Sequence, residues 1–179
     1  MASVNYQSMT FDTYISADRI AGRVRELAQQ LANDYAGCTP HFICVLNGAV
    51  FFFTDLLRAL PIDCTISFTQ LRSYNGTEST GEIEVVKPID VDVRDRDVII
   101  VEDIVETGLS MHYLKSVLEA QKPRSVRVIS LLYKPSELHY KDAAPDYAGF
   151  EISREFVIGY GLDINGIARN LPDIYTLRK

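Results

Sequence analysis

The chain has 179 residues, of which 47% are hydrophobic, and it carries a net charge of −6 at neutral pH. This length predicts a single domain, residues 1–179, and the acidic balance excludes an overall basic field that would attract nucleic acid or an anionic membrane. The sequence contains no stretch of roughly 18 apolar residues and no secretory leader pattern, so we expect a soluble, cytoplasmic protein.

The three cysteines, Cys38, Cys44 and Cys64, are odd in number and lack the spacing of metal ligands. Cys44 and Cys64 lie in apolar or alternating stretches that are typical of strands. We therefore expect reduced core thiols rather than a disulfide or a metal site.

The amino-terminal part predicts a helix followed by a strand. Residues 16–35 form an amphipathic pattern, with Ser16 able to cap the start and Gly37 after the end. The apolar residues at helical spacing are Ile20, Val24, Leu27 and Leu31. An apolar strand is expected over residues 41–46.

A turn at residues 47–48 then leads into a largely buried helix over residues 49–60. Residues 62–68 alternate between apolar and polar side chains, which predicts a half-exposed strand. Residues 73–82 contain two glycines and few apolar residues, which indicates a mobile surface loop.

The centre of the chain predicts a strand over 98–101, a helix over 110–120 and a second strand over 126–132. This order and spacing indicate a right-handed crossover unit of a parallel sheet. Beyond Pro145 the pattern predicts irregular structure that is rich in glycine and too short for a separate domain. We expect a core at about residues 38–135 and a small hood from about 145–179, with or without the amino terminus.

The run from Val98 to Ser110 is the most informative feature of the sequence. Four β-branched apolar residues suit a strand that is buried on both faces, and Thr107-Gly108 suits a tight turn that opens a helix. Glu102 and Asp103 would then lie at the carboxyl end of the strand, where open α/β sheets bind ligands. Helix N–H groups on one side and acids on the other favour a phosphorylated sugar as the ligand.

Residues 98–110 resemble the phosphoribosyl pyrophosphate signature of the type I phosphoribosyltransferases. Further stretches resemble the hypoxanthine-guanine branch of this family, and together they span roughly residues 40–170. These stretches are 45–49, 73–74, 79–82, 132–134, 145–151 and 156–163. The resemblance implies an α/β fold with an open, mostly parallel, twisted sheet that is flanked by helices and covered by a small hood.

The resemblance also implies roles for the residues around the ribose. Glu102 and Asp103 would contact the ribose hydroxyls and Mg²⁺, although an acidic pair can also simply end a strand. Thr107, Gly108, Leu109 and Ser110 would bind the 5-phosphate, a role that uses the same N–H groups as ordinary helix capping.

Glu106 departs from the family pattern, which usually has Asp as the proposed acceptor of a proton from the purine. Glutamate can act as the same kind of base, but its carboxylate is displaced by about one bond length. Two interpretations follow: the pocket is shaped for the longer side chain and Glu106 is the catalytic base, or Glu106 only orients the substrate.

The pyrophosphate end shows a second departure, because Asn47 replaces the common Lys before Gly48. The resemblance assigns the pyrophosphate to Asn47, Gly48 and Arg169, although Asn-Gly is also a good turn pair by itself. Ser73 and Tyr74 would belong to a lid that closes over the site.

The resemblance places the purine against Lys134, which would donate to its six-oxo group. Phe156 would stack on the base, the Val157 backbone would meet the base edge, and Asp163 would bind a second Mg²⁺. Outside the family context, Lys134 would be a solvated lysine and Phe156 a core residue.

The implied reaction is purine salvage, in which hypoxanthine, and guanine as well, displaces pyrophosphate from phosphoribosyl pyrophosphate to give IMP or GMP. Alternatives are a guanine- or xanthine-preferring enzyme, an RNA-binding regulator with the same fold, or an inactive scaffold. The implied partners are small-molecule substrates and Mg²⁺, without nucleic acid or membrane, in a homodimer or homotetramer.

Overall fold

The structure is a computed structural model that describes residues 3–6, 8–73 and 83–178, and these residues form two β-sheets and three α-helices. The larger sheet contains β3 (His41–Leu46), β4 (Thr65–Ser73), β5 (Ile83–Lys87), β6 (Asp97–Val105), β7 (Ser125–Tyr133) and β8 (Tyr147–Glu151). The smaller sheet contains β1 (Ser3–Tyr6), β2 (Met9–Ile15), β9 (Val157–Ile158) and β10 (Ile174–Leu177). The helices are α1 (Ala17–Asp34), α2 (Val50–Ala59) and α3 (Leu109–Glu119), with 3-10 turns η1 (Pro135–Glu137) and η2 (Lys141–Ala143).

The larger sheet has the strand order β5-β4-β3-β6-β7-β8, and every neighbouring pair except β4 with β5 is parallel. This arrangement confirms the expected open, mostly parallel sheet flanked by helices. From β3 the chain crosses through α2 to β4, whereas from β6 it crosses through α3 to β7 on the opposite side. The direction of winding therefore reverses between β3 and β6, and such a switch point is where doubly wound sheets bind ligands.

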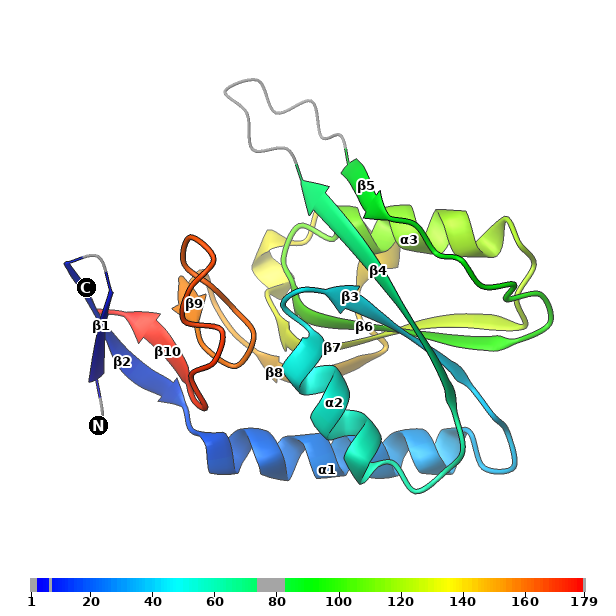
Figure 1. Cartoon of the computed structure of the whole chain (residues 1–179), viewed down its shortest axis with the longest axis horizontal. Coiled ribbons are helices and arrows are strands. Elements are labelled where there is room, and N and C mark those ends of the chain that lie inside the picture. Colours follow the sequence, from blue (N-terminus) through cyan, green and yellow to red (C-terminus); the bar gives the residue numbers. More distant parts are fainter. Residues whose placement is uncertain (1–2, 7, 74–82, 179) are drawn as a thin grey trace.

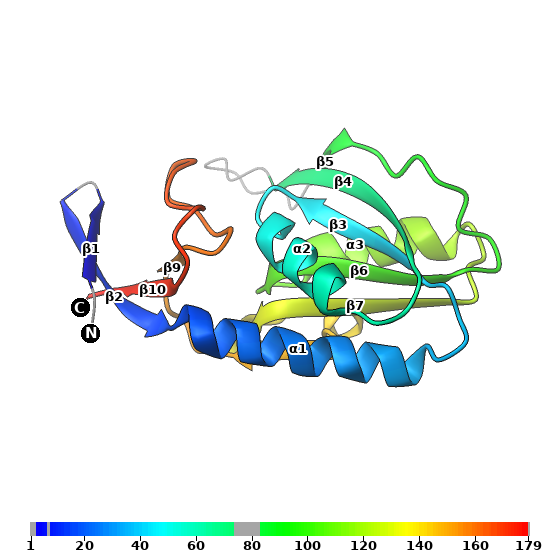
Figure 2. The ribbon, with the colours of Figure 1, turned by 60° about the horizontal axis from the view of Figure 1, so that its bottom comes forward.

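Helices cover both faces of the larger sheet (Figures 1 and 2). Phe42 and Cys44 of β3 point to the face that is covered by α1 and α2. Ile43 and Val45 point to the opposite face, against α3. Because alternate residues of a strand face opposite sides, the continuous apolar run of β3 is what a sheet buried on both faces requires.

The first helix follows the sequence pattern closely. The backbone N–H of Arg19 donates to Ser16 Oγ at 3.4 Å, so Ser16 is the cap, and the predicted apolar stripe is buried. The predicted strand 41–46 and the predicted helices 49–60 and 110–120 agree with β3, α2 and α3 to within one residue at each end.

The prediction of a strand over 62–68 was wrong in its position. β4 runs from Thr65 to Ser73 because it pairs in parallel with β3 from His41 opposite Thr65 to Leu46 opposite Gln70. Its last residues, Gln70 to Ser73, then pair with the antiparallel edge strand β5. The sequence pattern did not predict β5. Long-range pairing thus sets the limits of β4, whereas its alternating pattern does not.

The segment after Pro145 is divided between the two sheets. Tyr147–Glu151 forms β8, which pairs in parallel with β7 in the larger sheet, although the pattern had suggested irregular structure. The smaller antiparallel sheet joins β1 and β2 near the amino terminus to β9 and β10 near the carboxyl terminus, in the order β1-β2-β10-β9. We call this sheet with its connecting loops the hood; it lies at one end of α1, beside both termini (Figure 1).

The cysteines are free, but the expectation of three core thiols was wrong for two of them. Cys44 is buried, Cys64 is partly exposed and Cys38 is exposed. Burial, together with the nearby Glu102 and Asp103 charges, raises the pKa of the Cys44 thiol to about 12. In the described part of the chain, no helix is long and apolar enough to span a membrane.

Candidate functional site

Two adjoining pockets lie at the carboxyl end of β6, beside the switch point. The first, which we call the turn pocket, has a volume of about 160 Å³ and is lined by Glu102, Ile104, Val105, Glu106, Thr107, Gly108, Leu109, Ser110 and Met111. The second, the hood pocket, has a volume of about 290 Å³ and is lined by Asp103, Ile104, Glu106, Lys134, Phe156, Val157, Leu162 and Asp163. Ile104 and Glu106 line both pockets, so one ligand with two ends could occupy both.

The turn pocket is built on the start of α3. Gly108 has a φ of +84°, and a Cβ at this position would lie 2.8 Å from Ala143 Cβ and 2.9 Å from Leu138 Cδ1. Only glycine accommodates both the left-handed backbone and this close packing. The Thr107 carbonyl accepts hydrogen bonds from the backbone N–H groups of His139, at 3.0 Å, and Tyr140, at 3.3 Å. These hydrogen bonds fix the turn against residues 139–140. The first residues of α3 line the pocket, as in anion sites at helix N-termini.

Glu102 and Asp103 form an acidic pair beside this turn, in which Glu102 is buried and Asp103 is partly buried. β6 continues beyond the predicted end at Val101 because Glu102 pairs with Ser130 and Ile104 with Leu132 of β7. Burial and the neighbouring Asp103 charge raise the pKa of Glu102 well above its ordinary value. Burial also raises the pKa of Asp103, against the opposing effects of its hydrogen bonds and of the Arg169 charge. A cationic or hydroxyl-bearing ligand would relieve the electrostatic cost of holding these two carboxylates side by side away from bulk water.

The turn after β3 packs between this acidic pair and the hood. A Cβ on Gly48 would lie 1.6 Å from Asp103 Oδ2, and a Cβ on Gly161 would lie 1.9 Å from the Gly48 carbonyl oxygen. Gly161 belongs to the hood and has a φ of +102°. These two glycines therefore allow the hood, the Asn47-Gly48 turn and Asp103 to meet without intervening side chains. The Leu46-Asn47 peptide bond in this turn is cis.

Arg169 links two predicted site residues within the hood. Its Nη2 lies 2.6 Å from Asp163 Oδ1, and its Nη1 donates to the Gly161 carbonyl at 2.6 Å. Asp163 Oδ2 also accepts a hydrogen bond from the Gly166 backbone at 2.7 Å. Arg169 thus neutralises Asp163, and its charge also acts on Asp103 across the boundary between hood and core.

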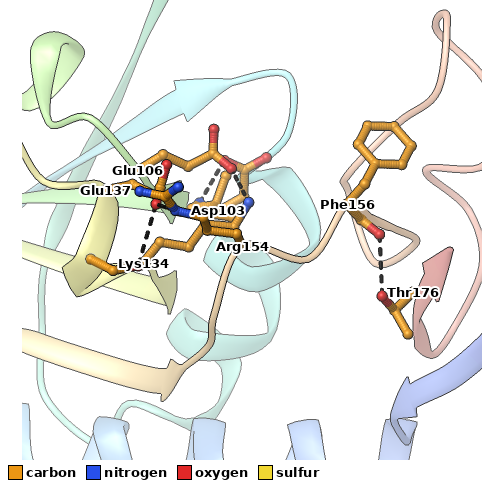
Figure 3. Close-up of polar contacts among 9 residues, drawn as sticks. Asp103, Glu106, Lys134, Glu137, Arg154, Phe156 and Thr176 are labelled. Carbon is orange, nitrogen blue, oxygen red and sulfur yellow. Dashed lines mark hydrogen bonds and ion pairs between the residues drawn. The ribbon is translucent and has the colours of Figure 1, made fainter. Parts of the chain in front are cut away.

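Lys134 and Glu106 form an ion pair across the hood pocket, and Figure 3 shows the two side chains directed toward each other. They meet because each follows a paired residue, Val105 on β6 and Tyr133 on β7, and because the Lys134 backbone N–H donates to the Val105 carbonyl at 2.9 Å. Lys134 is 7% exposed, so its side chain is buried, whereas a lysine outside any motif is usually solvated.

The wall of the hood pocket opposite Lys134 is formed by Phe156, Val157 and Leu162. Val157 is buried, whereas Phe156 is 47% exposed, a large exposure for an aromatic ring. The Phe156 carbonyl accepts hydrogen bonds from the Leu177 backbone at 3.1 Å and from Thr176 Oγ1 at 3.4 Å (Figure 3). Strand β10 therefore fixes the Phe156 backbone while its ring remains available for stacking on a ligand.

Two nearby charges were not identified from the sequence. Arg154 forms an ion pair with Glu137, which joins the segment before β9 to η1 close to Lys134 (Figure 3). Neither residue belongs to a recognisable motif, and their sequence separation of 17 residues gives no periodic signal. Of the two residues predicted to belong to the lid, the structure describes only Ser73, which is the last residue of β4. Tyr74 and the rest of the predicted lid lie outside the described residues.

The acidic side chains of the site are the groups that could bind Mg²⁺. Within residues 3–6, 8–73 and 83–178, no group of three or more His, Cys, Asp or Glu side chains is arranged to hold a metal ion. Mg²⁺ is usually held by one or two carboxylates together with substrate phosphates, rather than by a cage of protein ligands. The neighbouring carboxylates of Glu102 and Asp103 fit such a shared site.

The chain is similar to known proteins over most of its length. The model of the phosphoribosyl transferase domain matches residues 12–165. The hypoxanthine-guanine-xanthine phosphoribosyltransferase of Tritrichomonas foetus is 41% identical over 162 residues, which cover 90% of this chain and 88% of that protein.

Two solved structures extend the similarity to the fold. A hypoxanthine-guanine phosphoribosyltransferase from Bacillus anthracis, with HEPES in its active site, is 40% identical with a TM-score of 0.87, covering 93% of this chain and 98% of that chain. The hypoxanthine phosphoribosyltransferase of Trypanosoma cruzi, in complex with its product IMP, is 32% identical with a TM-score of 0.87, covering 98% of this chain and 97% of that chain.

Proposed function

The chain belongs to the phosphoribosyltransferase family, and on that basis we propose that it transfers the 5-phosphoribosyl group from phosphoribosyl pyrophosphate to hypoxanthine and guanine. The products are IMP or GMP and pyrophosphate, so the reaction belongs to purine salvage. The observation that carries the proposal is the pair of adjoining pockets that share Ile104 and Glu106. A nucleoside monophosphate has a phosphate at one end and a base at the other, which matches this pair.

We assign the 5-phosphate to the turn pocket. Leu109 and Ser110 are the first residues of α3, and their N–H groups carry the positive end of the helix dipole. The Thr107 and Ser110 hydroxyls add further donors. The left-handed conformation of Gly108 supports the role, because it turns the chain into α3 so that Leu109 and Ser110 line the pocket.

The base fits the hood pocket, where Lys134 can donate to a six-oxo group and the exposed ring of Phe156 can stack. The Val157 backbone would meet the edge of the base. A buried, charged donor favours an oxopurine over adenine, because the amino group of adenine would leave the lysine without an acceptor. The name of the Tritrichomonas relative includes xanthine, which makes xanthine the other base to compare.

Glu106 is placed between the two pockets, where a base would take a proton from the purine imidazole nitrogen as the new bond forms. Its ion pair with Lys134 supports this role, because the six-oxo oxygen and the imidazole nitrogen of an oxopurine lie on the same edge of the base and could face the two groups together. The same contact supports the interpretation that the pocket is shaped for the longer side chain. We therefore favour Glu106 as the base over a purely orienting role.

Asn47, Gly48 and Arg169 would hold the departing pyrophosphate, with Glu102, Asp103 and Asp163 as the residues that would hold Mg²⁺. When bound with the substrate, Mg²⁺ supplies charge neutralisation for the pyrophosphate. Asp163 would have to exchange its ion pair with Arg169 for the metal. Glu102 and Asp103 would also stabilise the positive charge that develops on the ribose ring, as in glycosyl transfer.

The proposal is tested by measuring initial rates with phosphoribosyl pyrophosphate and Mg²⁺ for hypoxanthine, guanine and xanthine, with adenine as the control base. We expect turnover with hypoxanthine and guanine and none with adenine. Absence of turnover with every base would refute the proposal. Competition between pairs of bases would rank their kcat/KM values. A cytoplasmic location and assembly into a homodimer or homotetramer remain predictions.

A further inference from the structure

The hood touches the Asn47-Gly48 turn through one unusual stretch of backbone, residues 159–163, which we call the hood loop. Gly159, Tyr160 and Gly161 all have positive φ values, of 95°, 47° and 102°. Left-handed backbone is costly for a tyrosine, and such residues persist where their surroundings hold them in place. Formation of the loop alone therefore does not explain why residue 160 is a tyrosine.

Hydrogen bonds within the hood hold the backbone of this loop. The Tyr160 N–H donates to Leu171 O at 2.8 Å, the Gly161 N–H donates to Arg169 O at 2.9 Å, and the Gly159 N–H donates to Leu162 O at 3.0 Å. These contacts shape the loop, but they do not tie it to the core.

The Tyr160 side chain supplies a tie to the core. It is 9% exposed, and its hydroxyl donates to Asp55 Oδ2 of α2 at 2.6 Å. Its ring also contacts Phe51 of the same helix, with a centroid separation of 6.3 Å. Burial and the Asp55 carboxylate raise the pKa of the Tyr160 phenol, so the hydroxyl remains a donor throughout the neutral range. Hydrogen bonds to a charged acceptor are stronger than neutral ones.

The position of α2 makes this tie relevant to the site. Helix α2 begins at Val50, directly after the Asn47-Gly48 turn, and Gly161 follows Tyr160 and packs against the Gly48 carbonyl. The Gly161 carbonyl accepts from Arg169, which pairs with Asp163. Any movement of Tyr160 relative to α2 would therefore shift Arg169 and Asp163 relative to the turn.

We propose that the hydrogen bond between Tyr160 and Asp55 positions the hood loop on the Asn47-Gly48 turn, and that it thereby sets the affinity for the pyrophosphate part of the substrate. Tyr160 is a positioning residue, because it acts through Gly161 and Arg169. The inference rests on the proposed function, since that function assigns pyrophosphate to these groups. The base would be affected less, because most of its pocket is formed by β6, Lys134, Phe156 and Val157, and only Leu162 and Asp163 of the hood loop line it.

The chain offers a matched control for this contact. The Tyr147 hydroxyl donates to Asp34 Oδ2 at 2.5 Å, which ties β8 to the end of α1. Neither residue lines the turn pocket or the hood pocket. The variant Tyr147→Phe therefore removes the same kind of bond without touching the site.

The test compares Tyr160→Phe, Asp55→Asn and Tyr147→Phe with the wild type by steady-state kinetics and thermal melting. Tyr160→Phe keeps the ring contact with Phe51, and Asp55→Asn keeps an acceptor oxygen. We expect Tyr160→Phe to raise the KM for phosphoribosyl pyrophosphate by about tenfold, which corresponds to about 1.4 kcal/mol, while the KM for hypoxanthine changes by less than about twofold.

Asp55→Asn should give a smaller rise, because the neutral amide still accepts the hydrogen bond. Tyr147→Phe should lower the melting temperature and leave both KM values unchanged. Equal KM values for phosphoribosyl pyrophosphate in Tyr160→Phe and wild type would overturn the inference, and so would parallel rises for both substrates.

Calorimetry of pyrophosphate with Mg²⁺ separates this inference from the proposed function, because binding needs no turnover. Weaker binding to Tyr160→Phe than to the wild type and Tyr147→Phe would support the inference even if the assays showed no product. Equal binding by all three proteins would refute it, even in an active enzyme.

Discussion

Replacing Gly48 with alanine should separate catalysis from stability in this protein. The new Cβ would lie 1.6 Å from Asp103 Oδ2, whereas Cβ atoms in real structures keep at least 3.0 Å from such neighbours. The Asp103 carboxylate must therefore move by about 1.4 Å, the difference between these two distances. Its present position is fixed by a 2.7 Å hydrogen bond that Oδ1 accepts from the Ile104 backbone.

The expected effect on activity follows from this displacement. A misplacement of about 1 Å in a reacting or orienting group can cost on the order of 100-fold in rate. We therefore expect kcat/KM for phosphoribosyl pyrophosphate to fall at least about 100-fold, which corresponds to about 2.7 kcal/mol. The side chain of Asp103 can rotate to make room, so the free energy of unfolding should fall by no more than about 1 kcal/mol.

Initial-rate kinetics and thermal melting would measure the two effects. Gly22→Ala is the matched control, because Gly22 lies inside α1 and a Cβ there would meet nothing within 4 Å. This control should retain wild-type kinetics and gain about 0.5–1 kcal/mol from the higher helix propensity of alanine. Wild-type kcat/KM in Gly48→Ala would refute the assignment of Asp103 to the site, and so would a loss of activity that merely tracks unfolding.

Two further substitutions test the electrostatics of the site. Because burial and Asp103 raise the pKa of Glu102, the folded protein binds more protons than the unfolded chain above pH 4, and stability is lost as the pH rises through this raised pKa. Glu102→Gln should therefore melt about 2–4 °C above the wild type at pH 8, and the difference in melting temperature should become smaller toward pH 4. The activity of this variant should fall. A melting temperature below that of the wild type at pH 8 would contradict this prediction. Lys134→Met should raise the KM for hypoxanthine by about 10-fold or more, the effect of losing a charged hydrogen bond, and leave the KM for phosphoribosyl pyrophosphate within about threefold. Equal changes for both substrates would remove Lys134 from the base pocket.

The sequence predicted the parts of the fold whose patterns are local. The stripe from Ile20 to Leu31 and the Ser16 cap define α1, and the β-branched run at 98–101 identifies the central strand. Strand limits were less predictable, because partners set them. β6 continues through Glu102 to Val105 because β7 pairs alongside it, whereas the two acids Glu102 and Asp103 indicated the end of the strand.

The site shows the same division. The residues from Glu102 to Ser110 could be predicted because a strand end, a turn and a helix start are contiguous in sequence. The ion pair of Glu106 with Lys134 joins residues 28 positions apart, and the contact of Tyr160 with Asp55 joins residues 105 positions apart. The sequence pattern does not give the distance in space between residues so far apart in the chain. Only the folded structure shows that the two members of each pair are in contact.

Glu106 is the residue that we propose as the base in transfer of the phosphoribosyl group to hypoxanthine. The most direct measurement is chromatographic quantification of IMP and pyrophosphate from hypoxanthine, phosphoribosyl pyrophosphate and Mg²⁺, for the wild type, Glu106→Gln and Glu106→Asp. We predict one IMP for each pyrophosphate in the wild type, and a rate that falls about 100-fold in Glu106→Gln and less in Glu106→Asp. Pyrophosphate release without IMP, or a Glu106→Gln variant as fast as the wild type, would contradict the claim.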